Sequence, residues 1–210
     1  MVLVVLALVA TLGAVAAGVL TRDDEEEPAA PAAQKPFTTA PLADYDAAAA
    51  VVTRGPFCAT VDERQVDAVL GQVPDVLEWR NGDEVDLTGA GADVVHEFGC
   101  AWSVQDVGAA RAWVFAPPVD AARAQRLVTS AGKGPGCVVG SGPAFGSPTL
   151  ALTCTKDGTT RASYRGLFGD AWLVCEVERP ADAGVDVDVV DLAGRWCVGV
   201  LQATAPEAKG

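Results

Sequence analysis

Six cysteines constrain the fold of this 210-residue chain more than any other feature: Cys58, Cys100, Cys137, Cys154, Cys175 and Cys197. No two of them lie closer than the 17 positions between Cys137 and Cys154, and His96 is the single histidine. Zinc sites normally show closely spaced ligand pairs, so we expect no metal site. An even set of well-separated cysteines favours three disulfides in an oxidising compartment, whereas six buried free thiols in a cytosolic protein are the alternative.

Three of these cysteines alternate in phase with apolar residues, as on the buried face of a strand: Cys100 with Trp102 and Val104, Cys154 with Leu150 and Leu152, and Cys175 with Leu173 and Val177. Six cysteines can pair in many ways, and the sequence does not decide among them. We favour sequential pairing, Cys58–Cys100, Cys137–Cys154 and Cys175–Cys197. Each bridge would add about 2–4 kcal/mol, mainly by restricting the unfolded chain.

Residues 1–20 contain no charged side chain, and they precede Arg22 and the acidic run 23–27. A helix over the segment would span roughly 28 Å, close to the ~30 Å hydrocarbon core of a bilayer. We therefore predict a transmembrane anchor over 1–20. A cleaved signal peptide is the alternative, because residues 14–16 (Ala-Val-Ala) have the small-x-small form of a cleavage site. The missing basic n-region and the length of the apolar run count against cleavage.

The orientation of this anchor depends on two opposing signals. Arg22 follows the apolar segment and alone would favour an inside C-terminus. The cysteines favour an outside C-terminus, and we give them more weight. We expect a single-pass protein of the cell membrane, with its C-terminal domain extracytoplasmic and the membrane as one partner.

The rest of the chain divides into a linker, one domain and a short tail. Residues 21–56 are acidic and rich in proline and alanine, which is typical of an extended linker. The domain is expected over 57–205 and the tail over 206–210. Its roughly 150 residues suffice for one hydrophobic core, which buries about 70% of the unfolded surface.

Within the domain, the pattern predicts helix, two strands, helix, three strands, helix. The first helix has a capping box with Thr60 as N-cap and stops at Gly71, and a polar, glycine-bearing stretch spans 81–93. Further elements are strands near 97–104 and 111–116, a helix capped by Asp120, strands near 150–155, 159–165 and 171–177, and a final helix from Asp186 or Asp188. Lys156-Asp157-Gly158 indicates a hairpin turn. The expected fold is α+β: a disulfide-stapled antiparallel sheet of about five strands with about three helices packed on it.

Charge excludes one class of partner. The formal net charge is −13, and without the acidic run 23 acids still face 15 bases. Nucleic-acid binding needs clustered Lys and Arg to neutralise phosphates, so we expect no nucleic-acid partner.

No motif indicates catalysis or a cofactor. Gly140-Ser141-Gly142 lacks the first glycine of a nucleophile elbow, and nothing links Ser141 to His96. Gly89-Ala90-Gly91 fails as a dinucleotide fingerprint at its third glycine. We therefore predict no catalytic residue and no cofactor.

The tryptophans suggest both core and surface positions. Trp102 and Trp196 lie within two residues of a cysteine and should pack on disulfides in the core. Trp172 is out of phase with Cys175, and Trp79 has polar neighbours, so both are candidates for a surface contact with a partner. The apolar tip of the 165–170 loop adds Leu167 and Phe168 to that candidate contact.

Three segments of the domain are distinctive: Cys58 before a helix that ends at Val69-Leu70-Gly71, then Cys100-Ala101-Trp102, and then Phe168-Gly169-Asp170-Ala171-Trp172. A cysteine-bearing final helix follows them. Together these features resemble small cell-envelope proteins of actinobacteria. Many of those are lipoproteins that carry a domain of unknown function. This chain departs from them in lacking an acylated N-terminal cysteine. The resemblance implies an exported, membrane-tethered domain with no assigned activity.

The leading functional hypothesis is a non-enzymatic extracytoplasmic domain that binds another envelope protein or a small ligand. The alternatives are an envelope hydrolase or transferase that uses carboxylates in a cleft, a structural spacer, and a secreted protein after signal cleavage. Two acids of unlike environment in one pocket would favour the enzyme. An exposed apolar patch would favour the binding domain.

Overall fold

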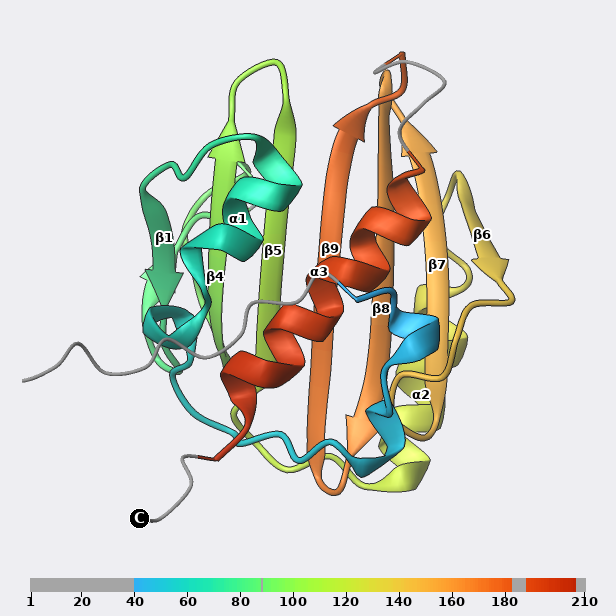
Figure 1. Cartoon of the computed structure of the whole chain (residues 1–210). Coiled ribbons are helices and arrows are strands. Elements are labelled where there is room, and N and C mark those ends of the chain that lie inside the picture. Colours follow the sequence, from blue (N-terminus) through green and yellow to red (C-terminus); the bar gives the residue numbers. More distant parts are fainter. Residues whose placement is uncertain (1–39, 88, 183–187, 207–210) are drawn as a thin grey trace, which may run out of the picture. The chain divides into compact units, whose positions relative to one another are not determined.

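The centre of the fold is a seven-stranded antiparallel sheet (Figure 1). The computed structural model describes residues 40–87, 89–182 and 188–206. The spatial order of the strands is β1-β4-β5-β9-β8-β7-β6. Their bounds are β1 Val76–Trp79, β4 Glu97–Val104, β5 Gly108–Phe115, β6 Cys137–Gly140, β7 Thr149–Lys156, β8 Thr159–Phe168 and β9 Ala171–Pro180. Two short strands, β2 (Glu84–Val85) and β3 (Asp93–Val94), pair separately as a small antiparallel hairpin.

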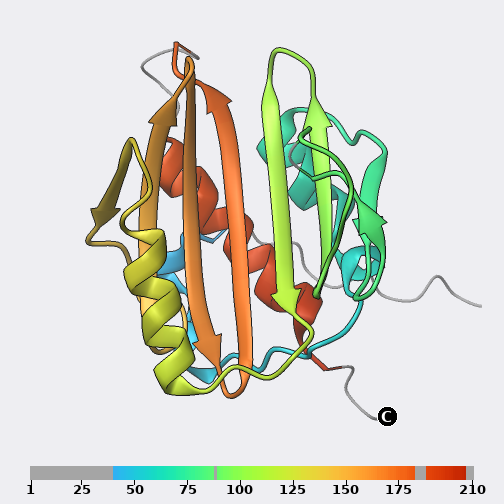
Figure 2. The ribbon, with the colours of Figure 1, turned by 180° about the vertical axis from the view of Figure 1, so that it is seen from behind.

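Helices cover the two faces of the sheet unequally. α1 (Glu63–Leu70) and the long α3 (Val189–Thr204) lie on one face, and α2 (Ala121–Ala131) lies on the other (Figure 2). α3 buries Ala193, Trp196 and Val200 at helical spacing in the main core. The main core therefore lies between the sheet and α1 and α3, while α2 covers a smaller apolar cluster that includes Trp172.

Acidic side chains cap all three helices. Asp120 accepts from the Arg123 amide at 2.6 Å and Asp188 from the Val190 amide at 2.9 Å, which confirms the expected starts of α2 and α3. For α1 the expected cap, Thr60, is wrong, because Asp62 caps the helix. Thr60 lies in a 3₁₀ turn (Cys58–Thr60), where its hydroxyl lies 2.8 Å from the Ala203 carbonyl oxygen and ties this turn to α3.

Three disulfides join these elements: Cys58–Cys100, Cys137–Cys154 and Cys175–Cys197. They are the pairs that the sequence favoured. The first links the segment before α1 to β4, the second links neighbouring residues of β6 and β7, and the third links β9 to α3. Trp102 and Trp196 lie in the same core cluster as two of these bridges and pack edge to face, with ring centroids 5.4 Å apart, as expected for core residues.

The packed domain begins before residue 57, where the sequence analysis placed its start. Leu42, Ala47 and Val52 are buried in the main core. The Thr53 amide donates to the Thr204 carbonyl oxygen at 2.9 Å. The expected linker is therefore too long: its alanine-rich end contributes apolar side chains to the core. Residues 21–39 of that expected linker lie outside the described residues.

The α+β class, the antiparallel sheet, the three helices and the three disulfides are confirmed. The expected number of about five strands is too low, because β1 and β6 extend the sheet at both edges. The expected transmembrane segment, 1–20, lies outside the described residues. Among the helices that are described, none has both the length and the apolar character needed to cross a membrane.

Candidate ligand-binding cleft

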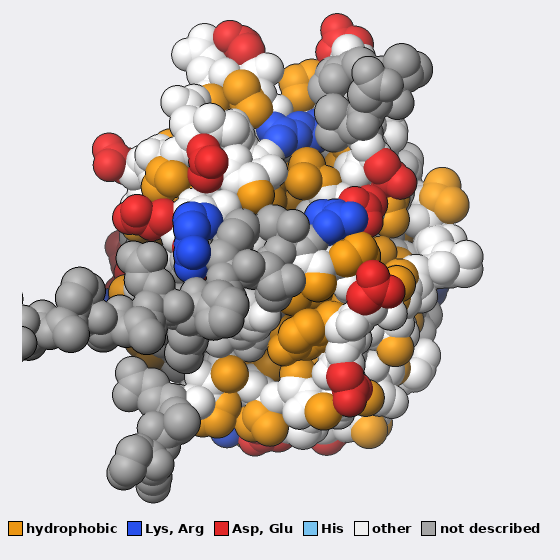
Figure 3. All heavy atoms as spheres, viewed as in Figure 1, with side chains coloured by type: hydrophobic (Ala, Val, Ile, Leu, Met, Phe, Trp, Pro, Cys, Tyr) orange, Lys and Arg blue, Asp and Glu red, His pale blue; other side chains and the backbone are white. Residues whose placement is uncertain are grey.

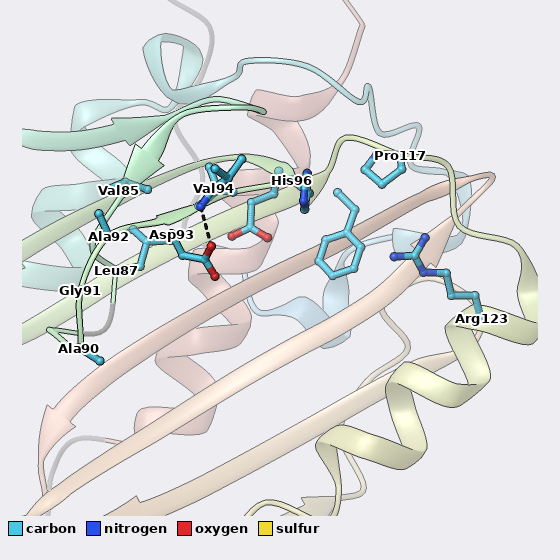
Figure 4. A pocket seen from close by; sticks show the side chains of 13 residues that line it. Val85, Leu87, Ala90, Gly91, Ala92, Asp93, Val94, His96, Pro117 and Arg123 are labelled. Atoms are coloured by element: carbon cyan, nitrogen blue, oxygen red, sulfur yellow. Dashed lines mark hydrogen bonds between the residues drawn. The ribbon is translucent and has the colours of Figure 1, made fainter.

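A cleft lies on the face of the sheet that α1 and α3 leave uncovered. It consists of two cavities of about 710 and about 280 Å³. Leu87 and Glu97 belong to the walls of both, so the two cavities adjoin. The larger cavity lies among the β2–β3 hairpin, the start of β4, the end of β5 and the first turn of α2 (Figure 4).

Backbone hydrogen bonds close the β2–β3 hairpin that lines this cavity. The Gly82 amide donates to the Val95 carbonyl oxygen at 2.9 Å, and the Val95 amide donates to the Asp83 carbonyl oxygen at 3.0 Å. Between the two strands, the Asp86 carboxylate accepts from the amides of Gly89 at 2.6 Å and Gly91 at 3.1 Å. The hairpin and its turn are therefore shaped by hydrogen bonds to main-chain groups.

Most of the larger cavity is apolar. Its aliphatic and aromatic lining is Val85, Leu87, Ala90, Ala92, Val94, Val95, Phe115 and Pro117. Its polar side chains are Asp93, His96, Glu97 and Arg123. Figure 4 shows Asp93 on the hairpin side and Arg123 on the α2 side of this space. Apolar walls with a few polar groups are the usual composition of a small-molecule site.

Glu97, the first residue of β4, is the acid that the two cavities share. Burial raises the pKa of Glu97 more than the nearby Trp79 indole N–H and His96 lower it. No basic side chain in the described ranges forms an ion pair with Glu97. Carboxylates with a pKa perturbed by burial are typical of functional sites.

Arg123 lies in the first turn of α2, at the other side of the larger cavity. Its guanidinium carbon lies 5.8 Å from the centroid of the Phe115 ring, a cation–π arrangement. No carboxylate in the part of the chain that the structure describes forms an ion pair with Arg123.

The smaller cavity is lined by two tryptophans, Trp79 of β1 and Trp113 of β5. Trp79 is buried, and its indole lies against Gly99 of β4. Among the described residues no group accepts from the Trp79 Nε1–H at hydrogen-bond geometry, although the indole lies near enough to the Glu97 carboxylate to lower its pKa. A buried donor without an acceptor costs about 1–3 kcal/mol, which an oxygen of a bound molecule would offset.

Arg111 and Glu176, which line the smaller cavity, belong to a network of ion pairs. Arg111 Nη1 lies 3.2 Å from Glu176 Oε1 and 3.4 Å from Glu178 Oε2, and Arg161 Nη2 lies 2.7 Å from the same Glu178 oxygen. Although burial acts against it, Arg161 and Arg111 hold the pKa of Glu178 below its ordinary value. Arg111 is therefore already paired with carboxylates of the protein itself.

The four residues expected at a partner contact are all buried: Trp79, Trp172, Leu167 and Phe168. Their expected surface placement is wrong. Trp172 does lie on the opposite sheet face from Cys175, but α2 covers it together with Leu167. Phe168 packs in the main core, and Trp79 is the one of the four that lines the cleft.

Glu97 and Arg123 were not among the site residues expected from the sequence. One signal was available: the polar stretch 81–93 is longer than an ordinary hairpin loop, and loops of that length are often functional. Ser141 and His96, which the sequence gave no reason to link, line different cavities. Within the described residues no group of three or more His, Cys, Asp or Glu could hold a metal ion.

Comparison with known proteins adds one distant structural similarity. No family model and no curated protein matches the chain. A GTP-binding regulator from Thermotoga maritima aligns at 12% identity and a TM-score of 0.31, covering 67% of this chain and 87% of the other. A similarity at this level carries no functional argument.

Proposed function

We propose that this chain is a non-enzymatic binding domain of the cell envelope, tethered to the membrane and located outside the cytoplasm, which holds a small molecule in the cleft. The observation that carries this proposal is the larger cavity. Its volume of about 710 Å³ is that of a typical small-molecule site, and its walls are mainly apolar with a few charged groups.

The rim of the cleft supports the same function. Leu77, Leu87 and Val94 line the two cavities, yet they remain 48%, 38% and 43% exposed. When a ligand covers large aliphatic side chains that line a concave surface, apolar area is removed from water, and this favours binding. This arrangement favours a ligand with an apolar body.

The extracytoplasmic location rests on the three disulfides, because such bonds persist in oxidising compartments. The test is alkylation of protein from its own host under denaturing, non-reducing conditions, followed by mass spectrometry. We expect no alkylated cysteine. Six alkylated cysteines would overturn the location.

The binding function is tested by mapping the amide shifts that a collection of small molecules causes in isotope-labelled protein. We expect shifts that cluster around Leu87, Val94 and Glu97. Ala92→Trp should abolish them, because Ala92 is an exposed residue of the cavity wall. Ala49→Trp, at an exposed site in a 3₁₀ turn on the other side of the sheet, should leave them unchanged. Shifts that never map to the cleft would refute the proposal.

One observation favours the enzymatic alternative. Asp93 is exposed and Glu97 is partly buried with a raised pKa, so two acids in unlike environments line one cavity. The discriminating assay measures release of nitrophenol from a panel of nitrophenyl glycosides and esters. Turnover that falls by roughly 100-fold or more in Glu97→Gln would establish acid–base catalysis and replace the binding function. We expect no turnover.

A further inference from the structure

We propose that the cleft binds a small zwitterion with an apolar body, of the dipeptide class, with its ammonium group beside Glu97 and its carboxylate beside Arg123. This inference rests on the proposed binding function and specifies its ligand. It follows from charges on the cavity wall that the protein itself does not pair.

Glu97 and Arg123 are opposite charges that line the same cavity, and neither forms an ion pair within the described residues. They come from different elements, β4 and α2. A partly buried charge without an ion-pair partner loses hydration, and at Glu97 the nearby Trp79 N–H and His96 offset only part of that loss. A ligand with a single charge would pair one of them, whereas a zwitterion pairs both.

The other polar groups of the cleft determine the direction in which the ligand lies. Asp86, Asp93 and His96 lie with Glu97 on the β2–β3 and β4 side, and Arg123 is the charge that α2 contributes. Arg111 and Glu176 also line the smaller cavity, but they pair with each other. The potential is therefore negative beside the hairpin and positive beside α2, which directs an ammonium group to the former and a carboxylate to the latter.

The space between these charges suits a peptide-like body. Leu87, Phe115 and Trp113 provide apolar walls for a side chain. The buried Trp79 Nε1–H, in the adjoining cavity, lacks an acceptor that a peptide carbonyl oxygen can supply. Each chemical part of an apolar dipeptide thus has a counterpart in the cleft.

The test uses the full chain and the dipeptide Leu-Phe in four forms: free, N-acetylated, C-amidated, and blocked at both ends. Affinity is measured by titration calorimetry, and the site is mapped by amide shifts. The free dipeptide should bind in the cleft. Each single block should weaken binding roughly tenfold or more, because it removes a charge-assisted hydrogen bond, which is among the stronger kinds.

Two variants assign each end of the ligand. Glu97→Gln should remove the preference for a free ammonium group and keep the preference for a free carboxylate. Arg123→Gln should do the reverse. The matched controls remove the same charge nearby: Glu84→Gln on β2 and Arg126→Gln on α2, both exposed and outside the cavity walls. Both controls should keep both preferences.

Several results would overturn the inference. Equal affinity for the free and C-amidated forms would make the ligand a simple cation, and equal affinity for the free and N-acetylated forms would make it an anion. Preferences that survive in both cleft variants would place the charges elsewhere. If other small molecules shift cleft amides and the dipeptide does not, the inference fails and the binding function stands. If no small molecule shifts them, both fail.

Discussion

The indole ring of Trp79 lies against Gly99, so closely that a Cβ atom at position 99 would overlap the ring. The same Cβ would lie 2.8 Å from the Trp113 Cβ. Because Gly99 of β4 has no side chain, the indole of Trp79 on the edge strand β1 can pack directly over it. This packing forms the wall of the smaller cavity and brings the Trp79 N–H near Glu97.

Gly99→Ala should therefore destabilise the domain by about 1–3 kcal/mol, the usual cost of overpacking a core. Denaturant unfolding followed by tryptophan fluorescence measures the change. Gly140→Ala is the matched control in another strand, because its nearest neighbour would be the Ala151 Cβ at 3.9 Å, an ordinary contact. Equal stability of the two variants would show that Trp79 can move at no cost.

Glu97→Gln should stabilise the domain at neutral pH. Burial raises the pKa of Glu97 above its ordinary value of 4.5, so the folded state binds this proton more tightly than the unfolded chain. That contribution to stability is fully present below the unfolded pKa and is lost as the pH rises through the folded pKa. The variant should therefore unfold at a higher temperature than the natural protein at pH 7, with the difference shrinking toward pH 4. Glu84→Gln, which changes an exposed acid, should show neither effect.

Leu42→Ala should cost about 2–5 kcal/mol, as for other buried leucines. Leu42 is 3% exposed in the main core, where it lies against Gly194 of α3. Val51→Ala, in the same segment, removes an alkyl group that is 61% exposed and should change the free energy of unfolding by less than about 0.5 kcal/mol. Similarly small changes in the free energy of unfolding for both variants would show that residues 40–56 belong to the linker and not to the packed domain.

Cys137–Cys154 should be the first disulfide to be reduced in the folded protein. Both of its cysteines are partly exposed at the sheet edge, whereas the other four cysteines are buried. Attack by a thiolate requires access to sulfur. Mild reduction without denaturant, then alkylation and peptide mass mapping, should label positions 137 and 154 before any other. Earlier labelling at 175 or 197 would contradict the packing of α3 on β9.

Much of the fold follows from local sequence. Asp157-Gly158 adopts φ values of +50° and +74°, as its turn signal predicted, and joins β7 to β8. Asp120 and Asp188 begin their helices where the pattern placed them. These features depend on neighbours within a few residues, so a local pattern contains the information they need.

Local reasoning does not tell which face of the sheet a helix covers. Figure 3 shows the face that α1 and α3 cover, where acidic and basic side chains lie among exposed apolar ones in the part that the structure describes. Trp172 was expected at the surface because the sequence does not say which sheet face α2 will cover. Leu167 was expected there as the tip of a loop, but it belongs to strand β8 and lies in the same buried cluster. Strand alternation predicts on which face of the sheet a side chain lies, but not whether a helix covers that face.

The sequence alone determined the α+β class and the five inner strands of the sheet, because alternation, caps and turns act over short distances, and its six cysteines favoured three disulfides. It did not indicate the edge strands β1 and β6. Only the tertiary structure decided that the β2–β3 hairpin, β4 and α2 would meet around Glu97 and Arg123. These two residues are 26 positions apart, and neither lies in a recognisable motif. A site of this kind exists through long-range packing, since the same residues in an unfolded chain share no environment.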